Sequence, residues 1–153
     1  MTDISITIRS AGPKDADAVS ALVRDAFAIY TPLIGKPPAP VFYDYMQLIE
    51  TGRVTLCMDD QTLLGIVYIY FEEDGAAMLD VLAVSEAARG RGVATRLVTE
   101  AEHQARQAKA GEMKVYTNAV MTGPQVMYPK LGYTETHRGE SDGYSRVHYS
   151  KAL

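Results

Sequence analysis

The segment Leu79–Ala94 places an apolar strand, a loop with two glycines and the start of a helix in direct succession. The first N–H groups of a helix have no partner within it, and the helix dipole is positive there, so anions bind at this end. Gly90 and Gly92 let a phosphate approach the main chain without an intervening Cβ, and Arg89 and Arg91 add charged donors. The segment therefore predicts a pyrophosphate-binding site.

Two other anion-binding loops do not match this segment. A P-loop requires Lys followed by Ser or Thr after its second glycine, but Val93 and Ala94 occupy those positions. A dinucleotide-binding loop requires a further glycine where Thr95 stands, and an acidic residue after the next strand, which ends at Asn118. Kinase-type ATP chemistry and dinucleotide-dependent redox chemistry are therefore disfavoured.

Asp80 is a lone carboxylate within the apolar strand. Such a group is costly unless it has a partner or a function. Strand alternation places it on the same face as Val84, four residues later. Asp80 is either a base, directly or through water, or a structural partner; Glu72 and Glu73 are weaker candidates.

The elements that position these residues follow from hydrophobic periodicity and turn residues. We expect strands at 4–9, 53–58, 63–71, 77–84, 113–117, 133–138 and 144–150, and helices at 13–30, 41–50, 93–110 and 125–131. The order β-α-α-β-β-β-α-β-α-β-β predicts an α/β fold with a mixed, mostly antiparallel sheet and helices on both faces. Four prolines and a glycine predict that residues 31–40 form neither helix nor central strand, but a loop that is a wall, a lid or a plain connector.

Two motifs in this order identify a family resemblance. Residues Arg89–Ala94 fit the pattern Q/R-x-x-G-x-G/A, and residues Tyr128–Tyr133 read Tyr-x-x-x-Gly-Tyr. With the Leu-Ala-Val strand that precedes the loop, the chain resembles the GCN5-related N-acetyltransferase (GNAT) superfamily over almost its whole length. The resemblance implies acetyl-CoA-dependent acyl transfer to an amine, with the coenzyme between the strand 77–84 and the strand 113–117.

The resemblance also implies roles for individual residues. The main chain of Leu82, Ala83 and Val84 would lie along the pantetheine arm, and the Val84 N–H would polarise the thioester carbonyl. The pyrophosphate would be held by the N–H groups of Arg89, Gly90, Arg91, Gly92, Val93, Ala94 and Thr95.

Tyr128 matches a tyrosine that in many family members protonates the departing thiolate, although packing alone is the alternative role. Where relatives often carry Asn seven residues before this tyrosine, the chain has Met121, so Asn118 is the nearest polar candidate for that coenzyme contact. We expect Tyr30 and Phe42 to line the acceptor pocket.

Length, net charge and the positions of histidine and cysteine predict the domain number, the partners and the cellular location. A length of 153 residues predicts one domain, 1–153, and a net charge of −4 disfavours nucleic acid as a partner. We expect no signal peptide, no membrane span and no metal site, since His103, His137 and His148 lack ligand-like spacing. Cys57 is the sole cysteine, and we interpret it as a core residue. A chain that can form no internal disulfide is typical of a reducing compartment, so we expect a cytoplasmic protein.

The sequence therefore predicts an N-acetyltransferase that moves an acetyl group from acetyl-CoA to a primary amine of a small molecule in a ternary complex. The alternatives are a peptide or protein amine acetyltransferase, which would need an open groove, and a non-catalytic CoA-binding module, which the Met121 departure favours. The exposed edge of the terminal hairpin would allow a homodimer.

Overall fold

The computed structural model describes residues 5–153. The strands are β1 (Ile6–Ser10), β2 (Val54–Asp59), β3 (Thr62–Phe71), β4 (Ala77–Val84), β5 (Glu112–Asn118), β6 (Thr134–Ser141) and β7 (Tyr144–Ala152). The α-helices are α1 (Ala16–Phe27), α2 (Thr31–Ile34), α3 (Tyr45–Glu50), α4 (Val93–Gln107) and α5 (Thr122–Lys130), with single 3-10 turns at Pro13–Asp15, Ala28–Tyr30, Ala39–Phe42 and Glu86–Ala88.

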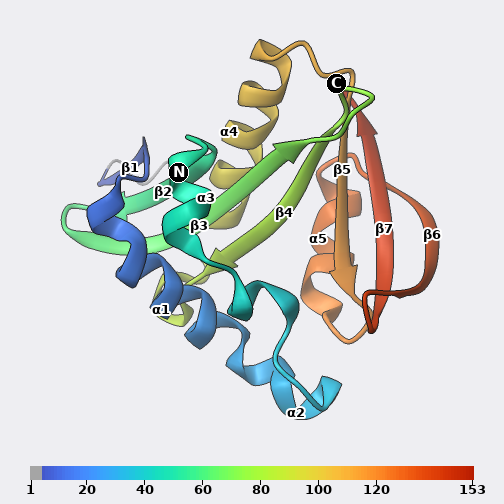
Figure 1. The fold of residues 1–153 in the computed structure, drawn as a ribbon, viewed down its shortest axis with the longest axis horizontal. Helices are drawn as coiled ribbons and strands as arrows, with labels where there is room; N and C mark the ends of the chain where they lie inside the picture. The colour runs from blue at the N-terminus through green and yellow to red at the C-terminus, as the bar shows by residue number, and fades with distance from the viewer. Residues whose placement is uncertain (1–4) are drawn as a thin grey trace.

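The strands form one sheet in the order β1-β2-β3-β4-β5-β7-β6, in which β4 and β5 are the parallel pair and the other neighbours are antiparallel. Helices α1 and α3 pack on one face, whereas α4 and α5 pack on the other (Figure 1). The predicted α/β class, with a mostly antiparallel sheet between helices, is confirmed.

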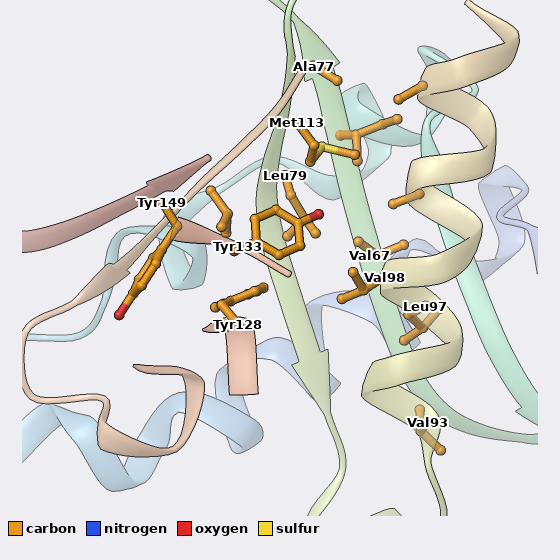
Figure 2. Close-up of a cluster of buried hydrophobic side chains, with 14 of the residues drawn as sticks. Val67, Ala77, Leu79, Val93, Leu97, Val98, Met113, Tyr128, Tyr133 and Tyr149 are labelled. Carbon is orange, nitrogen blue, oxygen red and sulfur yellow. The ribbon is translucent and has the colours of Figure 1, made fainter. Parts of the chain in front are cut away.

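Each face of the sheet has its own apolar cluster. On the face of α4, Leu97 and Val98 point from the helix toward the sheet, where Leu79 and Met113 are buried (Figure 2). The apolar stripe of α1 packs on the opposite face. Gly65 interrupts the apolar run of β3 because α4 lies close: a Cβ there would lie 3.0 Å from the Val93 side chain.

Some predicted boundaries differ from the structure. The first strand begins at Ile6, and Ile4 lies outside the described residues. Residues 31–40 were predicted to contain no helix, which is wrong for Thr31–Ile34: Pro32 stands in the first turn, where its missing N–H costs no hydrogen bond. Pro129 lies inside α5, as the sequence places it.

Strands β4 and β5 pair over only three residues, from Ala77 with Met113 to Leu79 with Val115. Beyond this short ladder the two strands diverge (Figure 1). Along the other edge of β4, Val81 pairs with Tyr68 and Leu79 with Ile69, so Asp80 is an extra residue in a β-bulge. The separation of the strands and the bulge therefore occur at the same point of the sheet.

Candidate active site

A cavity of about 380 Å³ opens where β4 and β5 separate. Its walls come from α1, the 38–40 segment, β4, the loop before α4, β5, α5 and β7. Among the described residues, its charged lining side chains are Asp80, Arg89 and Arg146, and most of the remaining wall is apolar. The position between the diverging strands is where the sequence predicts the coenzyme.

The backbone of β4 presents hydrogen-bond donors to this cavity. Ser85 donates its N–H to the Leu64 carbonyl of β3 at 2.8 Å. Bonded and non-bonded pairs alternate along an antiparallel ladder, so the N–H of Val84 points away from β3, toward the open side. The same alternation turns the Leu82 N–H into the gap and the Ala83 N–H toward β3. Of the three residues expected beside pantetheine, Leu82 and Val84 thus offer donors.

The loop before α4 adopts the conformation that its glycines allow. Gly90 and Gly92 have φ angles of +85° and +75°, in the left-handed region, and a Cβ at either position would meet no atom within 4 Å. The N–H groups of Gly92, Val93, Ala94 and Thr95 precede the first bond of α4, which Arg96 donates to the Gly92 carbonyl. The loop therefore presents backbone donors on an open surface that an anion can reach.

Two of the seven N–H groups expected at the pyrophosphate are used within the loop. The Arg89 N–H donates to Glu86 and the Arg91 N–H donates to Ala88. The Arg91 side chain also pairs with Asp59 at 3.0 Å, which holds the loop against the end of β2. The exposed Arg89 side chain lines the cavity instead. The donors that remain for an anion are backbone groups together with the Arg89 side chain.

Tyr128 lies in α5 and borders the cavity while being only 3% exposed. Its ring packs edge-on against Tyr133 at 5.5 Å and at a tilt against Tyr149 at 5.9 Å (Figure 2). Burial raises the pKa of the Tyr128 phenol, and the nearby Tyr149 adds to the rise. Its hydroxyl makes no hydrogen bond to any other residue in the described range. A protonated phenol is thus held beside the cavity.

Asp80 accepts a hydrogen bond of 2.6 Å from the Tyr116 hydroxyl of β5. The bulge breaks the alternation on which the expected shared face of Asp80 and Val84 depends: Leu79 packs in the cluster under α4, whereas Val81 packs in the cluster under α1. Asp80 and Val84 nevertheless both line the cavity, because it passes between the diverging strands.

A half-buried phenol lies on the α1 side of Asp80. The pKa of Tyr43 is raised to about 12 by burial and by the negative charge of Asp80. The pKa of Tyr116 is also raised, by burial first and then by Asp80. Both phenols therefore stay protonated at neutral pH and can donate hydrogen bonds toward this carboxylate.

The end of β5 supplies polar groups for a ligand. The Asn118 side chain accepts from the Val120 N–H at 3.1 Å, so its oxygen is occupied and its amide nitrogen is left to donate. The hydroxyl of Thr117 is buried without a hydrogen-bond partner among the described residues, and Thr117 lines the cavity. Sequence reasoning missed Thr117, since a threonine in a strand carries no signal of its own.

Two hydrogen bonds join distant segments of the chain beside the cavity. The Tyr144 hydroxyl donates to the Pro37 carbonyl at 2.8 Å, and Lys36 donates to the Gly143 carbonyl at 2.8 Å. These bonds tie the 31–40 segment to the β6–β7 turn. Tyr30 lines the cavity, whereas Phe42 is 69% exposed and is not part of its wall.

Neither a metal-binding cluster nor a membrane-spanning helix is found among the described residues. Between residues 5 and 153, no three His, Cys, Asp or Glu side chains come together as a metal site requires. None of the helices in that range is both long and apolar enough to cross a membrane.

Comparison with known proteins also indicates an acetyltransferase. The family model described as "Acetyltransferase (GNAT) family" matches residues 19–133. The fold is similar to Ard1 from Thermoplasma volcanium, with a TM-score of 0.79, 16% identity, and coverage of 97% of this chain and 98% of that one. It is also similar to the PaiA N-acetyltransferase from Thermoplasma acidophilum in complex with coenzyme A, with a TM-score of 0.78, 16% identity, and coverage of 97% and 99%.

A third similar structure is yncA from Salmonella typhimurium with its cofactor acetyl-CoA. It has a TM-score of 0.76 and 16% identity, and the match covers 97% of this chain and 94% of that one. No curated protein matches the chain.

Proposed function

The chain belongs to the GNAT acetyltransferase family, and from this premise we propose that it transfers an acetyl group from acetyl-CoA directly to the primary amine of a small molecule. The observation that carries the proposal is one cavity that joins the donor-lined loop before α4 to an end with aromatic walls and Asp80. The two substrates would enter from opposite sides and meet between β4 and β5.

The residues present fit acetyl-CoA. The loop donors at Gly92, Val93 and Ala94, with the Arg89 side chain, would hold the pyrophosphate. The unpartnered hydroxyl of Thr117 is a buried polar atom that a ligand in the cavity would satisfy. As co-substrate, acetyl-CoA supplies the activated acetyl group.

Three groups of the chain would act on the transfer. The N–H of Val84 would donate to the thioester oxygen as negative charge develops on it. The Asp80 oxygen that is not bonded to Tyr116 would accept the proton of the attacking amine, directly or through water. Tyr128, whose phenol is protonated at neutral pH, would give its proton to the departing thiolate of CoA.

Two hydrogen bonds beside the cavity support a small acceptor rather than a peptide. The bonds from Tyr144 to Pro37 and from Lys36 to Gly143 join the 31–40 segment to the β6–β7 turn. A peptide acceptor would need an open groove, which the joining of these segments disfavours.

A screen of primary amines tests the proposal. The protein is incubated with acetyl-CoA and each amine, free thiol is followed with a colorimetric reagent, and the acetylated amine is identified by mass spectrometry. We expect thiol release that depends on the acceptor, and a product that is heavier than the amine by the mass of one acetyl group less one hydrogen. Coenzyme binding without acceptor-dependent release would instead indicate a CoA-binding module.

A further inference from the structure

Arg146 of β7 is a charged side chain in the cavity wall that sequence reasoning did not single out. It is only 7% exposed. Its guanidinium lies 4.2 Å above the ring of Tyr116 and 5.5 Å from the ring of Tyr144. One nitrogen, Nη1, donates to Ser141 at 3.0 Å and to Asp142 at 2.9 Å. The aromatic stack and these two bonds hold the guanidinium in a fixed orientation.

The charge of Arg146 is only partly compensated by these contacts. The Asp142 side chain is 83% exposed, so water screens its attraction for the guanidinium. Nε and Nη2 donate to no other residue in the described range. A buried guanidinium with unused donors beside a cavity favours an anionic ligand, because buried charges are stable when they are paired and hydrogen-bonded.

The two charges at this end of the cavity both contact the same phenol, Tyr116. Arg146 stacks on the Tyr116 ring, while the Tyr116 hydroxyl donates to Asp80. The remaining charged lining residue, Arg89, belongs to the loop before α4, where the coenzyme phosphates are expected. An acceptor in this pocket therefore meets a carboxylate and a guanidinium at once.

We propose that the acceptor is an amino acid or a similar zwitterion, whose carboxylate binds Arg146 while its amine faces Asp80. This inference rests on the proposed function and narrows its substrate class. The planar fork of a guanidinium matches a carboxylate with two parallel hydrogen bonds. A singly charged carboxylate also suits the site better than a dianionic phosphate, since Asp142 already pairs with Arg146 and Asp80 adds a second negative charge to the cavity wall.

Pairs of amines that differ by one carboxylate test this assignment. Phenylalanine is compared with 2-phenylethylamine, leucine with 3-methylbutylamine and 4-aminobutyrate with propylamine, at saturating acetyl-CoA. We expect kcat/KM in at least one pair to favour the carboxylate member, and this preference to fall at least tenfold in Arg146→Gln. Because a carboxylate also lowers the pKa of a nearby amine, the change in preference between variants carries the test.

Two variants guard against an indirect effect. Arg146→Lys retains the charge but not the fork, so it should fold and lose part of the preference; it replaces Arg146→Gln if that protein is unstable. Arg138→Gln removes an exposed arginine that pairs with Glu135 on β6 and should leave the preference unchanged.

The results distinguish a failure of the zwitterion assignment from a failure of the proposed acetyltransferase function. Equal preference in wild type and in folded Arg146 variants, or better turnover of the carboxylate-free amines, overturns the zwitterion assignment while the acetyltransferase stands. Absence of thiol release with every amine, in a protein that still binds CoA, overturns the proposed function and the inference with it.

Discussion

Replacing Gly92 by valine tests the anion-binding loop directly. Gly92 has a φ of +75°, and a Cβ added there would meet nothing within 4 Å. The added Cβ therefore overlaps no atom, and we expect the left-handed backbone conformation to account for the cost of the substitution. An L-residue in the left-handed region costs about 1–2 kcal/mol, and a β-branched residue lies at the upper end.

This backbone cost affects coenzyme binding as well as stability. Valine relieves the strain by moving toward negative φ, which turns the N–H groups of residues 92 and 93 away from the ligand. A hydrogen bond to a charged group contributes about 1.5–3 kcal/mol. Loss of one such bond raises the Kd for CoA at least about tenfold, since about 1.4 kcal/mol corresponds to a factor of ten. Isothermal titration calorimetry with CoA measures the change.

Gly52 provides a matched control. It lies between α3 and β2, has a φ of +76°, meets nothing within 4 Å of an added Cβ, and is not part of the cavity wall. Gly52→Val should lower Tm about as much as Gly92→Val and leave the CoA Kd unchanged. The reasoning is refuted if Gly92→Val, folded and with the same Tm shift as Gly52→Val, binds CoA within twofold of wild type.

Three further substitutions test individual residues. Tyr128→Phe keeps the ring, so the CoA Kd should persist while kcat falls roughly 100-fold; undiminished turnover would remove Tyr128 from the mechanism. Asp80→Asn should give a kcat/KM that is low at pH 7 and climbs toward about pH 9–10; a wild-type-shaped profile with stability lower by about 1–3 kcal/mol would make Asp80 structural. Arg9 lowers the Asp15 pKa from 3.8 to about 2, so their pairing stabilises the fold above pH 3.8 and less as pH falls toward 2. In urea unfolding, Asp15→Asn should cost about 1 kcal/mol at pH 7, allowing for solvent screening, and clearly less near pH 2, where the native carboxyl is about half protonated; equal costs at both pH values would contradict this.

The order of elements could be predicted because each has a periodicity set by its own residues. The stripe of α4 repeats Val93, Leu97 and Val98 on one face, and all three are buried under the sheet. The turn at Asp142-Gly143 has positive φ at both residues, as a two-residue hairpin requires. These features depend on neighbours in sequence, which a single chain displays fully.

The bulge at Asp80 is a feature of the sheet that could not be predicted from the sequence of β4 alone. Alternation counts residues and assumes that each has a partner in the adjacent strand. One extra residue in β4 reverses the assignment of every later side chain to a face, and nothing in the composition of β4 marks it. The structure shows two features of Asp80 that its sequence position did not reveal. Asp80 occupies a bulge at the point where β4 and β5 part, and it has Tyr116 as its hydrogen-bond partner.

The coenzyme end and the acceptor end of the cavity also differ in how well the sequence could predict them. The coenzyme end is local, because consecutive N–H groups and two glycines suffice to build it, so the segment from 89 to 95 carries a recognisable pattern. The acceptor end is assembled from pairs across the fold: Tyr116 with Asp80, Arg146 on Tyr116, and Tyr144 with Pro37. Each of these side chains is an ordinary strand or loop residue in its own segment. In the proposed function such pairs would recognise the acceptor, so a substitution at one of them would alter the choice of acceptor while the local coenzyme site stays unchanged.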